Sequence, residues 1–135
     1  MTVARKVQVH LLDDIDGGKA DETLKFALDG VPVYPRSILI SRPELGQDML
    51  ACMGDHDVCV LRGHGITVHG RSVEEATIRA IKLEALARVN WIAATAGREI
   101  PSISPDDKEF FRSRGGGDPS PLPVWRYYVT LLDRK

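Results

Sequence analysis

The chain has 135 residues, of which 43% are hydrophobic and 27% charged, and its formal net charge is -1. This composition is typical of one globular domain, and the near-zero charge argues against direct contact with nucleic acid or an anionic membrane. The apolar runs are far shorter than the roughly 20 residues that cross a bilayer, and acidic residues interrupt the N-terminal segment before a signal-peptide core could form. We therefore expect a cytoplasmic protein, in which Cys52 and Cys59 act as small apolar residues rather than as a disulfide.

The first thirty residues predict a β-hairpin. Residues 6–12 alternate apolar and polar side chains, which is the pattern of a half-buried strand. The Asp- and Gly-rich segment 13–18 that follows is typical of a turn. Residues 22–28 alternate again and predict the second strand, with a helix as the alternative.

The segment after the hairpin predicts extended structure. Pro32 and Pro35 favour an extended chain, because proline fixes φ and disfavours helix in the residue before it. The apolar residues 37–40 predict a short strand. Residues 57–63 predict a buried strand, and residues 66–70 its continuation or its hairpin partner.

A helix is predicted between these strands, over residues 41–55. We expect Ser41 as its N-cap, Pro43 in its first turn and Gly54 near its end. A strand, a helix and a second strand in this order are typical of an α/β protein.

Residues 72–97 predict the longest helix. Ser72 is its expected N-cap, Glu74 and Glu75 lie at its positive N-terminal end, and Gly97 is its expected stop. Its apolar residues form two rows at helical spacing, which predicts a helix covered on more than one side. The first row is Ile78, Ile81, Ala85, Val89, Ile92 and Ala96, and the second is Ala76, Ala80, Leu83 and Ala87.

The C-terminal part of the chain is less regular. Residues 104–114 predict a short helix, and residues 115–123 are a flexible linker rich in glycine and proline. Residues 124–134 predict a final apolar helix or strand.

His64 is the histidine whose surroundings indicate a site. Gly63 and Gly65 flank it at the end of an apolar strand, and glycine lets the backbone turn and approach a ligand closely. From these residues alone, His64 is either a metal ligand or a structural histidine.

The other polar groups give weaker signals. His10 and His56 are expected on the solvated surface, and His69 is not paired with His64. The carboxylates are typical of turns, and neither cysteine has a neighbouring base that would lower its pKa. The glycine run 115–117 lacks the preceding strand and the closing Lys-Ser/Thr of a phosphate-binding loop.

The segment "DVCVLRGHGITVHGRSVEEATIRAIKLEALAR", residues 57–88, resembles the class II aldolase/adducin family. Residues 31–55 and the terminal "VWRYYV" look most like the branch that decarboxylates dihydroxylated aromatic acids such as dihydroxyphthalate. The resemblance implies a partial class II aldolase-like α/β/α layered domain. It also implies metal-dependent carbon–carbon lyase chemistry on a small hydroxylated acid or aldehyde.

In that family the histidine of the strand-end His-Gly binds a divalent ion, usually zinc, and this position is His64. The ion acts as a Lewis acid that stabilises a carbanion as the carbon–carbon bond breaks. Family members also carry a His-x-His pair and a catalytic acid in a preceding half of the domain. This sequence contains no His-x-His, so we expect an incomplete site with weak metal binding. Arg62 and Tyr128 are weaker candidates for contact with substrate or with a neighbouring subunit, and neither is assigned to the site.

The segment "RKVQVHLLDDIDGGKADETLKFALDGV" resembles the N-terminal dimerisation region of actinobacterial H-NS-like nucleoid silencers. This resemblance implies a silencer-like oligomerisation hairpin in residues 1–30, followed by the aldolase/adducin-like domain in residues 31–135. We expect a homo-oligomer that forms through residues 5–29. Three functions remain open: a metal-dependent lyase with an incomplete site, a non-catalytic oligomerisation module, and nucleoid association through co-assembly with a true silencer.

Overall fold

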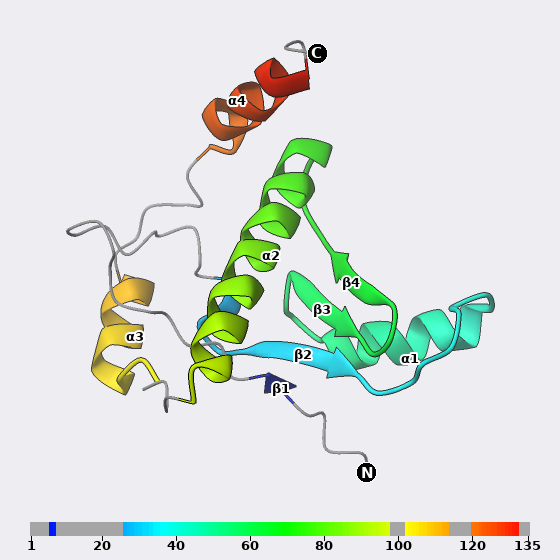
Figure 1. The fold of residues 1–135 in the computed structure, drawn as a ribbon. Coiled ribbons are helices and arrows are strands. Elements are labelled where there is room, and N and C mark those ends of the chain that lie inside the picture. Colours follow the sequence, from blue (N-terminus) through cyan, green and yellow to red (C-terminus); the bar gives the residue numbers. More distant parts are fainter. Residues whose placement is uncertain (1–5, 8–25, 98–101, 114–119, 133–135) are drawn as a thin grey trace.

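The computed structural model describes residues 6–7, 26–97, 102–113 and 120–132, and its centre is a small mixed sheet (Figure 1). The strands are β1 (Lys6–Val7), β2 (Val31–Tyr34), β3 (Val58–Leu61) and β4 (Gly65–Val68). They lie in the order β1-β2-β3-β4, so β4 is the outer strand of this sheet. β2 and β3 are parallel, whereas the β1–β2 and β3–β4 pairs are antiparallel.

Helix α1 (Pro43–Met53) connects the parallel strands β2 and β3. Parallel neighbours need such a crossover, because a tight turn can join only antiparallel strands. Pro43 opens the helix, and Gly54 ends it with a φ of 57°, as predicted. The predicted cap is wrong: Arg42 occupies the N-cap position and its side chain makes no capping hydrogen bond.

Three further helices follow the sheet: α2 (Val73–Thr95), α3 (Pro105–Ser113) and α4 (Leu122–Leu132). The hydroxyl of Ser72 accepts a hydrogen bond from the backbone N–H of Glu75 at 3.2 Å, which confirms the predicted cap of α2. The terminal apolar segment, left open between helix and strand, is helical. Within the described ranges, no helix combines the length and the apolar character needed to cross a bilayer.

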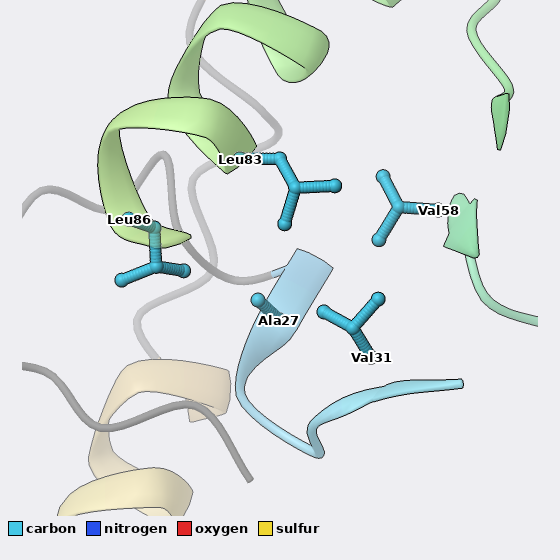
Figure 2. Packing of buried hydrophobic residues seen from close by; sticks show 5 residues of the cluster. All are labelled: Ala27, Val31, Val58, Leu83 and Leu86. Carbon is cyan, nitrogen blue, oxygen red and sulfur yellow. The ribbon is translucent and has the colours of Figure 1, made fainter. Parts of the chain in front are cut away.

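The side chains of β3 alternate between two apolar clusters on opposite faces of the sheet. Val58 packs in the cluster shown in Figure 2, together with Ala27, Val31 and the α2 residues Leu83 and Leu86. Cys59, the next residue, belongs to a second cluster with Tyr34 and Met53, against which further α1 side chains pack. Because neighbouring strand residues point to opposite faces, α2 covers one face and α1 the other. This is the predicted α/β/α layering.

One predicted strand is wrong, and a second is not a strand in the residues that the structure describes. Residues 37–40 form no strand, because the chain leaves the sheet after Tyr34. Within the predicted strand 22–28, Phe26 and Ala27 form a 3₁₀ turn, which agrees with the helical alternative. Ala27 then packs in the core beside Val31.

In the described residues, β1 pairs antiparallel with β2, and the pairs are Lys6–Pro32 and Val7–Val31. Most of the predicted hairpin, residues 8–25, lies outside the described residues.

Candidate functional site

His64 lies at the tip of the β3–β4 hairpin. Leu61 pairs with Gly65, which leaves residues 62–64 as the loop. The backbone N–H of His64 donates to the carbonyl oxygen of Leu61 at 3.0 Å, and Gly63 takes a φ of 76° that only glycine adopts without strain. Residues 66–68 thus belong to the hairpin partner of β3 and do not continue that strand. His64 itself is exposed to solvent.

The donor groups around His64 do not by themselves fit a tightly held divalent ion. A catalytic zinc site takes about three protein ligands. Across residues 6–7, 26–97, 102–113 and 120–132, no three His, Cys, Asp or Glu side chains come together in a metal-binding arrangement. Arg62, also in the loop, is exposed and carries no carboxylate or imidazole that could add a ligand.

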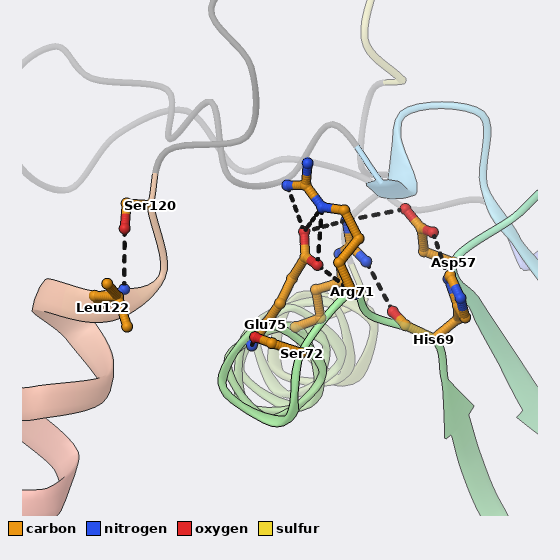
Figure 3. Close-up of polar contacts among 8 residues, drawn as sticks. Asp57, His69, Arg71, Ser72, Glu75, Ser120 and Leu122 are labelled. Carbon is orange, nitrogen blue, oxygen red and sulfur yellow. Dashed lines mark hydrogen bonds and ion pairs between the residues drawn. The ribbon is translucent and has the colours of Figure 1, made fainter.

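The base of the hairpin, at the opposite end from His64, is fixed by a network of charged residues (Figure 3). Arg79 of α2 connects three parts of the fold. Its Nη2 lies 3.2 Å from an Oδ atom of Asp57, which precedes β3, and 3.1 Å from Oε1 of Glu75. Its Nη1 donates to the carbonyl oxygen of His69 at 2.7 Å. The network therefore ties both ends of the hairpin to the first turns of α2.

Glu75 is the buried carboxylate of this network, with 5% of its surface exposed. It accepts hydrogen bonds from the backbone N–H and from the guanidinium of Arg71. These hydrogen bonds, with a smaller contribution from the charge of Arg79, lower the pKa of Glu75 to about 2. Glu75 is thus ionised throughout the neutral range, and it holds two arginines in place.

The two cysteines do not form a disulfide, and Cys59 is not an activated nucleophile. Burial raises the pKa of the Cys59 thiol, so it stays protonated at neutral pH. A surface pocket near Cys52 is lined by Asp29, Asp55, His56 and Asp57, but two of these groups have other partners. Asp29 pairs with Arg112 and Asp57 with Arg79. This pocket lies before β3, at the other end of the strand from His64.

The Arg71–Glu75–Arg79 series is not among the residues predicted from the sequence to form a site. Glu75 was assigned to the helix dipole and Asp57 to a turn. A signal was present for Glu75 and Arg79, because residues four apart in a helix lie on the same face and oppositely charged pairs at this spacing interact. The pairing of Arg79 with Asp57 brings together residues from different elements, and spacing alone gives no such contact.

A family model described as Class II Aldolase and Adducin N-terminal domain matches residues 8–91. Three 3,4-dihydroxyphthalate decarboxylases are also similar to this chain. The one from Terrabacter sp. (strain DBF63) is 41% identical over 108 residues, which are 80% of this chain and 45% of that protein. The one from Rhodococcus jostii (strain RHA1) is 39% identical over 103 residues, 76% of this chain and 42% of that protein. The one from Arthrobacter keyseri is 38% identical over 108 residues, 80% of this chain and 43% of that protein.

The fold has a solved counterpart in an aldolase II superfamily protein from Pseudomonas syringae. The two structures superpose with a TM-score of 0.59 at 23% sequence identity, over 87% of this chain and 54% of that chain. The chain thus spans less than half the length of the curated relatives and about half that of the solved one.

Proposed function

Because the chain belongs to the class II aldolase and adducin family, we propose that it contributes the His64 hairpin to a metal-dependent carbon–carbon lyase of the aromatic-acid decarboxylase type. His64 would serve as one ligand of a divalent ion, with zinc as our choice. The remaining ligands and the proton-transferring acid would come from polypeptide that corresponds to the other half of the longer relatives.

The placement of His64 carries this proposal. Its side chain is exposed at the tip of a hairpin whose loop is closed by a backbone hydrogen bond. The base of that hairpin is anchored to α2 through Arg79. A ligand on a rigid support keeps its geometry when an ion and further ligands arrive. An exposed tip also leaves room for a second polypeptide to add those ligands.

The substrate class rests on the relatives. Proteins that are 38–41% identical over most of this chain are 3,4-dihydroxyphthalate decarboxylases. We therefore propose a dihydroxylated aromatic acid as substrate and loss of its carboxyl group as the reaction.

The test is reconstitution of activity. We expect the purified chain alone, supplied with zinc or manganese, to release no carbon dioxide from 3,4-dihydroxyphthalate. Co-expression with the N-terminal half of the Terrabacter relative should give turnover. His64→Ala should lower that turnover by at least about a hundredfold, the usual cost of losing a key electrostatic group, whereas His56→Ala should not.

Two results would contradict the proposal. Turnover by the chain alone that His64→Ala abolishes would show that the sequence holds a ligand set of its own. A co-expressed pair that assembles and stays inactive, beside an active full-length relative, would favour the alternative of a non-catalytic oligomerisation module.

A further inference from the structure

The two cysteines of the chain, Cys52 and Cys59, lie in one side-chain cluster although they belong to different elements. Cys52 is in the last turn of α1, and Cys59 is inside β3. Cys59 is buried in the cluster that also contains Tyr34 and Met53, and Cys52 packs against that cluster. The fold therefore places both thiols in the layer between α1 and the sheet.

The two sulfur atoms lie against the same part of β2. The Cys52 thiol donates to the carbonyl oxygen of Val33 at 3.4 Å. Burial raises the pKa of the Cys59 thiol, a hydrogen bond with the Tyr34 backbone lowers it, and a hydrogen bond with the Cys52 side chain raises it. Val33 and Tyr34 share a peptide unit, and the two thiols interact directly as well. They are therefore neighbours in the folded chain.

The two thiols differ in their access to solvent. Cys59 has none of its surface exposed. Cys52 is partly exposed and lines the surface pocket together with Gly54 and His56. A thiol reacts with a molecule in solution only where that molecule can reach it. Cys52 is therefore the thiol that a small reagent meets first, and Cys59 is the thiol behind it.

We propose that Cys52 and Cys59 form an oxidisable pair, which a small disulfide such as oxidised glutathione converts into one intrachain disulfide. In the first step the Cys52 thiol loses its proton, its sulfur attacks the small disulfide, and one small thiol leaves. In the second step the Cys59 thiol loses its proton, its sulfur attacks the Cys52 sulfur, and the second small thiol leaves. The protein loses two hydrogen atoms, and the small disulfide is reduced to two thiols.

The arrangement favours the second step although Cys59 alone is a poor nucleophile. Burial keeps its thiol protonated and away from reagents in solution, but a mixed disulfide on Cys52 brings the reacting sulfur to it. Groups held side by side react as if at a very high concentration. The last turn of a helix also adjusts more easily than the middle of a sheet, which lets Cys52 reach the geometry that a disulfide requires.

Oxidation of this pair would join the end of α1 to the middle of β3. The bond closes a loop over residues 52–59, which contains Asp57, and the Asp57 carboxylate pairs with Arg79 at the base of the hairpin. Oxidation therefore restrains the segment between the crossover helix and the hairpin. His64 lies at the other end of β3, so the inference does not depend on the proposed lyase function.

The experiment incubates the folded chain with oxidised glutathione and analyses its peptides by mass spectrometry. Because the chain contains two cysteines, each single variant shows the reaction of the other thiol. The wild-type chain should form the intrachain disulfide and keep at least about tenfold less bound glutathione than Cys59→Ala, in which no second thiol releases it. Cys52→Ala should bind no glutathione, because Cys59 is buried. Cleavage before Asp55 and Asp57 separates the two cysteines, so a joined pair of peptides identifies the bond.

Phenylarsine oxide gives a second readout that needs no oxidation, because its arsenic atom bonds to two neighbouring thiols at once. The wild-type chain should bind it in a form that a dithiol removes and a monothiol does not, and both single variants should lose this binding. Circular dichroism checks that all three proteins are folded, and the peptide result on the wild-type chain does not depend on the variants.

Three results would overturn the proposal. The folded wild-type chain could keep as much glutathione as Cys59→Ala does. The two peptides could become joined only after unfolding in urea. The bond could link cysteines of two different chains instead of Cys52 and Cys59 of one chain.

Discussion

Glu75 is the residue whose ionisation the fold controls most strongly. Hydrogen bonds from Arg71 lower its pKa from 4.5 to about 2. A carboxyl whose pKa falls on folding stabilises the native state fully above its unfolded pKa, and this contribution is lost as the pH falls towards its folded pKa. We therefore expect the melting temperature to decline between about pH 4.5 and pH 2, and Glu75→Gln to reduce that decline. Thermal unfolding followed by circular dichroism over a pH series measures the melting temperature of both proteins.

At neutral pH, Glu75→Gln should lower the free energy of unfolding by about 3 kcal/mol, because it leaves the partly buried Arg79 with one carboxylate partner fewer. Glu84→Gln is the matched control, since Glu84 is exposed on the same helix. Equal pH profiles for the two variants would contradict the role assigned to Glu75.

Gly70 and Gly46 should respond in opposite directions to the same substitution. A Cβ at Gly70 would lie 2.6 Å from the backbone nitrogen of Ala76, so Gly70→Ala must displace the start of α2. We expect a loss of about 1–3 kcal/mol, typical of overpacking. At Gly46, inside α1, the nearest atom lies at 3.9 Å. Gly46→Ala should therefore stabilise the fold by about 0.4–1 kcal/mol. Urea unfolding measures the free energy of unfolding of both variants. Changes of the same sign in the two variants would contradict the close packing described at Gly70.

His64→Ala separates metal binding from stability. His64 is exposed in a loop, so its removal should change the unfolding free energy by no more than about 0.5 kcal/mol. Divalent binding by the chain should be weak and should disappear in this variant, because one imidazole holds zinc poorly. Titration calorimetry with zinc provides the measurement, and His56→Ala is the control. Stoichiometric, chelator-resistant zinc in His64→Ala would assign the site to other residues.

At the scale of elements, the N-terminal segment remains a predicted oligomerisation unit. Ala27 and Leu28 are buried and β1 pairs with β2, so deletion of residues 5–29 would damage the core. Val9→Asp with Leu11→Asp changes the apolar face of the predicted strand and keeps those contacts. We expect a lower mass in sedimentation, because an apolar strand face needs a partner.

The matched control is Gln8→Asp with His10→Asp, on the polar face of the same predicted strand. Identical masses for the wild-type chain and both double variants would contradict self-association through this segment.

Helices were easier to predict from the sequence than strands. The Ser72 cap and the apolar rows predicted α2, and Pro43 and Gly54 bounded α1. The predicted strand 37–40 is wrong because its apolar run carries no information on where the chain leaves the sheet. In α2, Val89 and Ile92 fit the helical period but are exposed. Periodicity gives the apolar face of a helix and does not say which part of that face the chain covers.

For the whole molecule, the family and the layered α/β/α fold predicted from residues 57–88 agree with the comparisons. The flanking glycines placed His64 at the end of a strand and left a hairpin as one of two alternatives, and the structure has the hairpin. The charged network at the hairpin base could not be predicted from the sequence, because Arg79 of α2 pairs with Asp57, which precedes β3 and lies far from it along the chain. A role for His64 in metal binding and the silencer-like role of the first thirty residues stay predictions.

The outer strand β4 has a consequence for handling the protein. Among the described residues no strand lies beyond it, and its sequence, Gly-Ile-Thr-Val, contains no charge. Natural sheets usually protect such edges with lysine or proline, whereas Ile66 of β4 is 42% exposed. Concentrated stocks should therefore precipitate through edge-to-edge strand pairing. Ile66→Lys should raise the solubility limit, and light scattering during stepwise concentration would record the difference.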